Sequence, residues 1–244
     1  MHHNGLARAG ASGAMAELKS SAYGRRLLEQ SPLFTQMDEN SRRDLIGQAI
    51  PRSFGPGETV CRIGDPGGSM MAVLAGTVRI SLPTVRGKEV ILGDLHTGEL
   101  FGEIALLDGK PRSANATALT KCELLVLERR NVIPFLERNP ATCLQLMELL
   151  CARIRRSDER MADLAFFELP TRLAKLLLSY GAERAGKEPR ISLSQTELAE
   201  MVGATRENVN RCLRDWQRRG LVKLQDGWTV ILDSEKLRSL LAQE

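Results

Sequence analysis

Hydrophobic and polar positions change their spacing along the chain and divide it into three stretches. Between Tyr23 and Ile50, apolar residues recur at the intervals of a helix. Between Pro51 and Leu127, short apolar or alternating runs are separated by glycine turns, which favours an antiparallel roll or barrel of short strands. From Asn131 onward helical spacing returns, with one strand pair near the end. The pattern predicts an α+β fold.

The first two stretches are expected to form one domain. Residues 1–20 are rich in alanine, glycine and serine, and this composition favours a flexible tail. The helix that ends near Ile50 is expected to be capped by Asn40 or Ser41. Helices and roll together are predicted to make a first domain over residues 21–138.

A helix of unusual length is predicted from Pro140, because proline is favoured at the first helical position, to about Glu168. Steps of three and four residues along one side define a coiled-coil seam with one polar member, consisting of Met147, Leu150, Ile154, Ser157, Met161 and Leu164. An identical chain is the simplest partner for such a seam. Residues 139–168 are therefore predicted to be a dimerisation helix.

The remainder, residues 169–244, predicts a winged helix-turn-helix domain. Leu169 precedes a proline, so the long helix should break there. Ser194 and Glu197 form a capping box, Gly203 permits a tight turn between two helices, and Thr205 caps the second helix.

A hairpin and a last helix complete this domain. Asp226-Gly227 lies between two apolar runs in Leu221–Leu232, a strong hairpin signal. Trp228 is expected to pack this wing down, and residues 234–242 are expected to form a short helix.

The two helices of the pair expose residue types that contact DNA. Arginine can pair with guanine O6 and N7, and a carboxylate can accept from the cytosine amino group, whereas serine and threonine suit phosphates. A solvated charged face is the alternative, but the capping box, turn and spacing together favour DNA. The candidate contacts are Ser194, Gln195, Thr196, Thr205, Arg206, Glu207, Asn210 and Arg211.

A segment inside the predicted roll, FGEIALLDGKPRSANATA at residues 101–118, carries the candidate ligand chemistry. Gly102 lets a ligand approach the backbone, and the free N–H groups of a short helix from Glu103 suit a phosphate. Arg112 adds a permanent charge and Ser113 adds a hydroxyl. The Glu103 carboxylate can accept from a sugar hydroxyl. The segment therefore offers an anion cradle and a sugar clamp.

The spacing from Gly102-Glu103 to Arg112-Ser113 resembles the phosphate-binding cassette of cyclic-nucleotide-binding domains. Cassette, long helix and winged helix-turn-helix, in that order, resemble the cyclic AMP receptor protein (Crp/Fnr) family of bacterial transcription regulators. The resemblance implies an N-terminal antiparallel β-roll that acts as a sensor, a long dimerisation helix and a C-terminal winged helix-turn-helix. It implies a homodimer that binds double-stranded DNA and contacts RNA polymerase, with the 182–190 loop as the candidate contact.

The resemblance also implies a set of ligand contacts. The cyclic phosphate and ribose would be held by Gly102, Glu103, Arg112 and Ser113. The strand pattern separately suggests that Val78, Leu100 and Ile104 line the pocket. In the family, two hydroxyl residues of the long helix touch adenine, one from each subunit. Ser157 matches the first and Asp158 departs from the second.

The departure at Asp158 leaves the base open. An ionised carboxylate accepts from the adenine amino group, or from the N1–H and amino group of guanine. The expected ligand is therefore cyclic AMP, with cyclic GMP possible. The alternatives involve no ligand. Ser157 would then be a polar residue that sets the register of the seam, and Asp158 would be a solvent-exposed acid.

For DNA, the resemblance implies a sequence preference. In the family, an Arg-Glu-x-x-x-Arg pattern reads a TGTGA-type half-site, and Arg206, Glu207 and Arg211 match it.

The amino-acid composition limits the classes of protein to which the chain can belong. The 244 residues carry a net charge of +4 with 43% hydrophobic residues, as in an ordinary soluble protein large enough for two domains, and nucleic acid is permitted as a partner. No apolar run is long enough for a membrane span, and residues 1–15 lack a signal pattern. The 5 cysteines include no C-x-x-C pair, and with 3 histidines no metal site is predicted. The expected location is the cytoplasm.

Two other hypotheses remain at this point. The chain can be a DNA-binding regulator that responds to another signal or needs no effector, in which case Glu103 and Arg112 form a structural ion pair. It can also be an enzyme that uses the same two residues on a phosphoester. No metal cluster, activated nucleophile or second carboxylate pair is visible in the sequence, so catalysis is not expected.

Overall fold

The computed structural model describes residues 38–84, 89–182, 190–225 and 227–242. The chain forms two compact units, Met1–Pro83 with Leu92–Ala152 and Thr84–Ile91 with Arg153–Glu244. The expectations for the tail at residues 1–20 and for the helical pattern before residue 38 lie outside the described part of the chain, as does most of the loop at residues 182–190.

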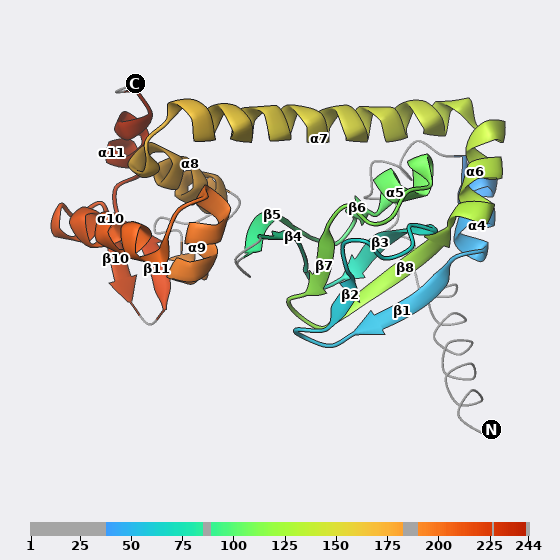
Figure 1. Ribbon diagram of the computed structural model, residues 1–244, viewed down its shortest axis with the longest axis horizontal. Coiled ribbons are helices and arrows are strands. Elements are labelled where there is room, and N and C mark those ends of the chain that lie inside the picture. The colour runs from blue at the N-terminus through green and yellow to red at the C-terminus, as the bar shows by residue number, and fades with distance from the viewer. Residues whose placement is uncertain (1–37, 85–88, 183–189, 226, 243–244) are drawn as a thin grey trace. The chain divides into compact units, whose positions relative to one another are not determined.

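The first unit contains a roll of two four-stranded sheets, ordered β1-β8-β3-β6 and β2-β7-β4-β5 (Figure 1). The paired strands β1–β8, β3–β8, β3–β6, β2–β7 and β4–β7 are all antiparallel, so the predicted roll is confirmed. The strands are β1 (Ile50–Phe54), β2 (Thr59–Cys61), β3 (Ser69–Ala75), β4 (Val78–Pro83), β5 (Glu89–Leu95), β6 (Leu100–Phe101), β7 (Asn115–Ala118) and β8 (Cys122–Glu128).

Strand β3 is apolar without alternation because both of its faces are covered. Met71 and Val73 belong to the cluster inside the roll, whereas Met70 and Leu74 pack with the helices outside it. A strand buried on both sides reads as a continuous hydrophobic run. Strand β1 was not predicted, because its sequence IPRSF contains a proline and two polar residues.

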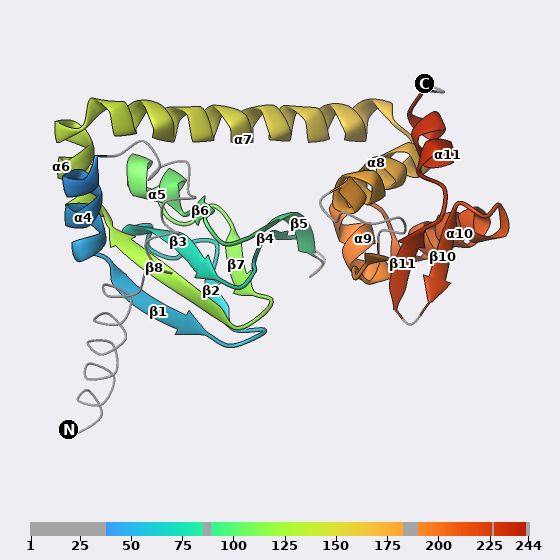
Figure 2. The same ribbon diagram turned by 180° about the vertical axis from the view of Figure 1, so that it is seen from behind.

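Helices cover one sheet of the roll. They are α4 (Glu39–Gly47), α5 (Glu103–Asp108), α6 (Arg129–Arg138) and the first turns of α7 (Pro140–Phe166), and α4 lies beside α6 in both ribbon views (Figures 1 and 2). Leu45, Leu106, Phe135 and Leu146 join these helices to β3 and β8 in one core.

The expected cap of α4 was wrong. Asp38 caps the helix, and its carboxylate accepts from the backbone N–H groups of Asn40 at 3.0 Å and Ser41 at 2.9 Å. Asn40 and Ser41 are therefore donors to the cap. Ile50 lies in β1 and not in the helix.

The part of the second unit that follows α7 is a winged helix-turn-helix, as predicted. Its elements are α8 (Leu169–Ala182), β9 (Arg190–Ile191), α9 (Gln195–Val202), α10 (Arg206–Arg218), β10 (Val222–Gln225), β11 (Trp228–Ile231), α11 (Ser234–Ser239) and a final 3₁₀ turn, η1 (Leu240–Ala242). The capping box is present, with Glu197 N donating to Ser194 Oγ at 3.2 Å and Ser194 N donating to Glu197 Oε2 at 2.8 Å. Thr205 Oγ1 accepts from Asn208 N and caps α10.

Two local expectations in this unit were wrong. The break between α7 and α8 falls at residues 167–168, and Leu169 already belongs to α8, because Pro170 lies in the first turn, where its missing N–H has no helical partner anyway. Trp228 is 40% exposed. Trp228 is the first residue of β11, and the three residues that follow it, Thr229, Val230 and Ile231, are all buried, so exposure is confined to the end of the strand.

The last turn of α7 contacts α8 and the turn between α9 and α10. Lys175 Nζ of α8 lies 2.7 Å from Asp163 Oδ1. Gly203, in the turn between α9 and α10, has φ +64°, and a Cβ there would lie 3.0 Å from Leu164 Cδ2. In the described part of the chain, no helix is both long and apolar enough to cross a membrane.

Gly203→Ala is expected to destabilise the second unit more than Gly220→Ala. Both glycines have positive φ, so alanine costs about 1–2 kcal/mol at either position, but only Gly203 has a close neighbour, whereas a Cβ at Gly220 meets nothing within 4 Å. Thermal unfolding followed by tryptophan fluorescence isolates this unit, because Trp216 and Trp228 are the 2 tryptophans of the chain. If the melting temperature falls by the same amount in both variants, the contact with Leu164 does not contribute to stability.

Candidate ligand site and nucleic-acid surface

The cassette segment follows β6 and places α5 between two glycines in the left-handed region. Gly102, with φ 79°, precedes the helix, and Gly109, with φ 71°, ends it. A Cβ on Gly102 would lie 2.2 Å from Arg112 Nη1 and 3.1 Å from Ser69 O. Glycine is therefore required at residue 102 both by the backbone angle and by the close approach of the arginine.

Arg112 is 5% exposed, and its guanidinium is held by backbone and hydroxyl oxygens. Nη1 donates to Ser69 O at 2.6 Å and to Gly102 O at 3.1 Å, and Nη2 donates to Ser69 Oγ at 2.8 Å. Nε is buried and has no hydrogen-bond partner among the described residues. A buried N–H without a partner is costly and therefore needs an explanation.

The backbone of Arg112 is fixed as well. Arg112 N donates to Asp65 O at 2.8 Å, and Gly64 N donates to Arg112 O at 2.9 Å. The loop before β3 therefore holds the backbone of Arg112, while Gly102 at the start of α5 contacts its guanidinium.

Glu103 is fully buried at the start of α5, beside Gly102 in the chain. Ser113 is exposed next to Arg112, and Ile104 is 47% exposed on α5. Val78 lies in the cluster inside the roll, whereas Leu100 lies in the cluster beneath the helices. The structure thus brings Gly102 and Arg112 into direct contact and places Glu103 beside them. Since α5 has only six residues, the positive charge at this site comes mainly from Arg112.

The positive charge of Arg112 also affects Cys61 of β2. Burial raises the pKa of the Cys61 thiol, and Arg112 partly opposes this increase. Cys61 pairs with Ala116 of β7 across the sheet. The thiol therefore lies within the electrostatic range of the Arg112 guanidinium.

A second buried arginine in the roll was not predicted. Arg79 Nε and Nη2 each lie 2.8 Å from one carboxylate oxygen of Asp94, a bidentate pair joining β4 to β5. The side chains are only 10% and 7% exposed. No local sequence signal marks this pair, because the two residues lie on different strands.

Ser157 and Asp158 lie on α7 within the second unit, and both are exposed. Ser157 Oγ donates to Arg153 O at 3.0 Å, the usual bond of a helical serine to the preceding turn. The predicted seam is solvent-exposed along α7, with Met147, Ile154 and Met161 each at least 50% exposed.

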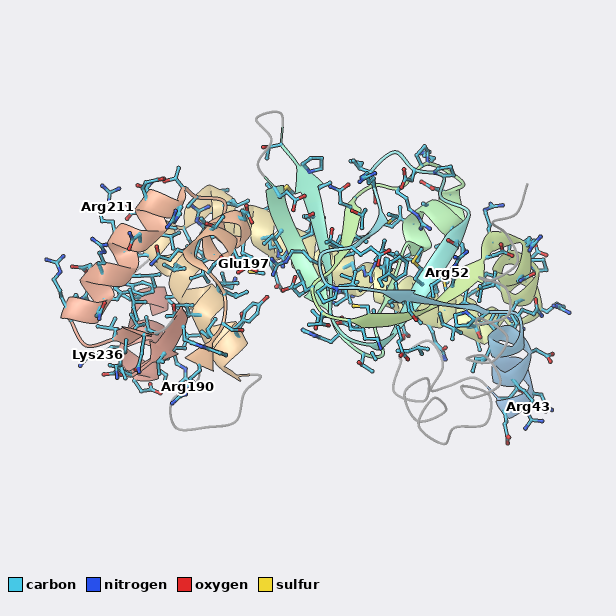
Figure 3. The ribbon with its side chains drawn as sticks, turned by 90° about the horizontal axis from the view of Figure 1, so that it is seen from below. Arg43, Arg52, Arg190, Glu197, Arg211 and Lys236 are labelled. Atoms are coloured by element: carbon cyan, nitrogen blue, oxygen red, sulfur yellow. The ribbon has the colours of Figure 1, made fainter. Side chains whose placement is uncertain are left out.

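The exposed face of α10 is polar and basic, opposite the buried Val209, Leu213 and Trp216. An open hollow on this face is lined by Glu207, Asn210, Arg211, Arg214, Gln217 and Arg218. Arg211 projects outward from α10 (Figure 3), and its Nη2 donates to Asn208 Oδ1 at 2.5 Å. Arg206 and Thr196 are exposed, and Gln195 is half-buried, while the hydroxyls of Ser194 and Thr205 serve as helix caps.

The packing of α10 also affects its cysteine. Burial, together with the nearby Asp215 carboxylate, raises the pKa of Cys212 to about 11. Cys212 is therefore a packing residue at ordinary pH. Across the described ranges, no three His, Cys, Asp or Glu side chains gather in a way that could hold a metal ion.

Comparison with known proteins matches both units. Residues 51–139 match the family model of the cyclic nucleotide-binding domain, and residues 171–240 match that of the Crp-like helix-turn-helix domain. The CRP-like cAMP-activated global transcriptional regulator of Mycobacterium tuberculosis is 32% identical over 217 residues, which cover 86% of this chain and 96% of the relative. The chain belongs to the Crp/Fnr family.

One further relative agrees with this assignment, and one solved structure shares the fold. The cyclic AMP receptor protein of Thermus thermophilus is 32% identical over 213 residues, covering 87% of this chain and 98% of the relative. The solved structure of a c-di-GMP responsive global regulator from Xanthomonas campestris aligns with a TM-score of 0.74 at 23% identity, covering 80% of this chain and 100% of that one. At this identity the second comparison supports the fold only.

Membership of the family confirms the resemblance found in the sequence and the predicted fold class. The chain is a Crp-like transcription regulator with a cyclic-nucleotide-binding domain and a DNA-binding helix-turn-helix. Sequence reasoning missed Ser69, the main partner of Arg112, because it lies 43 residues earlier in the chain.

Proposed function

We propose that this protein is a homodimeric transcription factor switched by a cyclic nucleotide, with cyclic AMP as the expected ligand and cyclic GMP as the alternative. The observation that carries the proposal is the Arg112 guanidinium, buried beside Gly102 with no partner for its Nε among the residues that the structure describes. A phosphate supplies the oxygen that such a donor needs.

The residues present fit a cyclic phosphate and a ribose. Arg112 pairs with the phosphate charge, and the backbone at Gly102 allows close approach because no Cβ intervenes. Ser113 adds a hydroxyl at the exposed edge. The buried carboxylate of Glu103 accepts from the ribose hydroxyl. The nucleotide acts as an allosteric ligand and supplies no chemistry, so no turnover is expected.

The base is assigned to α7. Ser157 would contact it through its hydroxyl, and Asp158 would accept from an amino group. The names of the relatives in M. tuberculosis and T. thermophilus refer to cyclic AMP, which supports adenine. Asp158 serves guanine equally well through its N1–H and amino group, so cyclic GMP stays as the alternative.

The dimer would form through residues 139–168. The exposed apolar row of Met147, Ile154 and Met161 on α7 needs cover, and a second copy of the same helix provides it. Two recognition helices would then lie about 34 Å apart, one turn of DNA.

In this arrangement, Arg206, Glu207 and Arg211 would read a TGTGA-type half-site, with Asn210 beside them. Ser194, Gln195, Thr196 and Thr205 would lie against phosphates. A contact with RNA polymerase is expected as well. The ligand would shift DNA affinity only as far as it binds the two states of the dimer with different strength.

The function is tested by fluorescence anisotropy of a labelled TGTGA palindrome at fixed salt, with no nucleotide, cyclic AMP or cyclic GMP. Tighter DNA binding with cyclic AMP alone supports adenine selection. An effect of both nucleotides makes Asp158 the next residue to change. A specific affinity that neither nucleotide alters would overturn the proposed ligand and favour a regulator with another effector or none.

Gly102→Ala is expected to abolish the nucleotide effect, whereas Gly109→Ala should preserve it. Both glycines flank α5 with positive φ, so backbone strain is matched. Only at residue 102 does the new methyl group reach the arginine, whereas at residue 109 the nearest atom is 4.0 Å away. Isothermal titration with cyclic AMP and cyclic GMP measures the difference, and equal affinities in the two variants would contradict the site.

Arg206→Ala is expected to weaken binding to the cognate palindrome by about 1–3 kcal/mol and to relax one base position. Arg219→Ala is the control, because Arg219 lies at the end of α10 and pairs with Asp215 at 3.4 Å. Anisotropy on cognate and scrambled DNA separates the effects. If Arg206→Ala loses the same affinity on both duplexes, the residue does not read a base.

A further inference from the structure

Arg112 uses its hydrogen-bonding donors unequally. A guanidinium has five N–H donors in a planar fork. Three donate to oxygens in this structure, at Ser69 O, Ser69 Oγ and Gly102 O. The two that remain are Nε–H and one N–H of Nη2, and Nε is buried and unpartnered within the described residues.

The pattern of contacts separates the two edges of the fork. Ser69 contributes its carbonyl oxygen to Nη1 at 2.6 Å and its hydroxyl oxygen to Nη2 at 2.8 Å, and so occupies the end of the guanidinium. The remaining donors, on Nε and Nη2, lie together on the side edge. That edge matches two oxygens of a carboxylate or phosphate.

The same chain shows what the side edge can do. Arg79 uses Nε and Nη2 to hold both oxygens of Asp94, each at 2.8 Å. At Arg112 the equivalent edge has no such partner at Nε in the described part of the chain. The two buried arginines of the roll thus differ in what completes them, a carboxylate for Arg79 and a ligand for Arg112.

We propose that Ser69 is a positioning residue for the cyclic phosphate. By occupying the end of the Arg112 fork, it turns the Nε–Nη2 edge toward two phosphate oxygens. Ser69 acts through Arg112 and does not touch the ligand. The proposal rests on the proposed function, since it assumes that the cassette binds a cyclic nucleotide.

The hydroxyl contact of Ser69 can be removed by mutation without disturbing the backbone of this segment. Ser69 begins β3 and pairs with Glu128 of β8, and Gly68 O accepts from Arg129 N at 2.9 Å, so the sheet holds the backbone of this segment. Replacement of the side chain leaves the carbonyl contact to Nη1 in place. Only the bond from Nη2 is lost, and with it the constraint on rotation of the fork.

The test compares two variants of the same shape in the full-length chain. Ser69→Thr keeps a hydroxyl, whereas Ser69→Val replaces it with a methyl group, and both suit a strand position. Titration calorimetry with cyclic AMP and cyclic GMP is expected to show a loss of about tenfold for Ser69→Val and Ser69→Ala, the effect of losing one charge-assisted hydrogen bond. Ser69→Thr should stay within about twofold of the wild type. Ser53→Ala, at an exposed position on β1, is the control for loss of a serine.

Melting temperatures without nucleotide complete the test. All four variants are expected to melt within a few degrees of the wild type. Equal affinity of the Thr and Val variants, or an unchanged affinity in Ser69→Ala, overturns the positioning role. A loss of affinity that follows a matching loss of melting temperature assigns Ser69 to stability alone and also overturns it.

The outcomes separate this proposal from the proposed function. If the wild type binds a nucleotide and Gly102→Ala loses it, but the Ser69 variants keep it, only the role of Ser69 fails. If the wild type binds neither cyclic AMP nor cyclic GMP, the proposed function fails and takes this inference with it.

Discussion

The ligand site depends on one buried charge. A guanidinium cannot be taken out of water unless oxygens meet its donors, and Arg112 at 5% exposure meets this condition through Ser69 and Gly102. The requirement fixes several other features. Residue 102 must be glycine because a Cβ would lie 2.2 Å from Nη1. The loop before β3 must approach closely enough for Asp65 O to accept from Arg112 N. Nε, which has no hydrogen-bond partner among the described residues, is the donor that the proposed phosphate would meet.

The long helix α7 contributes to both units. Near its start, Leu146 is part of the core that joins the helices to the roll. Near its end, Asp163 pairs with Lys175, and Leu164 lies against Gly203 in the helix-turn-helix turn. One continuous helix therefore makes contacts in each unit. For the proposed dimer to respond to a nucleotide, the nucleotide must bind one arrangement of the dimer more tightly than the other.

The two buried arginines of the roll illustrate how one side chain supports structure or binding. Arg79 is completed by Asp94 and holds β4 to β5, so it needs no further group. Arg112 is completed only in part. Identity of 32% with relatives in M. tuberculosis and T. thermophilus assigns the family. In the proposed function the choice of base depends on Asp158, whose carboxylate would accept hydrogen bonds from either purine.

Local sequence signals were sufficient for the winged helix-turn-helix, because the capping box at Ser194, the turn at Gly203 and the cap at Thr205 act over three or four residues. Short apolar runs between glycine turns likewise predicted the roll, and the residue types from Gly102 to Ser113 predicted the cassette. Tertiary structure decided what depends on distant partners. Strand β1 is a strand because β8 pairs with it, Trp228 is exposed at the first position of β11, and Ser69 holds Arg112 across 43 residues. Hydrogen bonds between distant residues leave no periodic trace in the chain, so only the folded structure could reveal them.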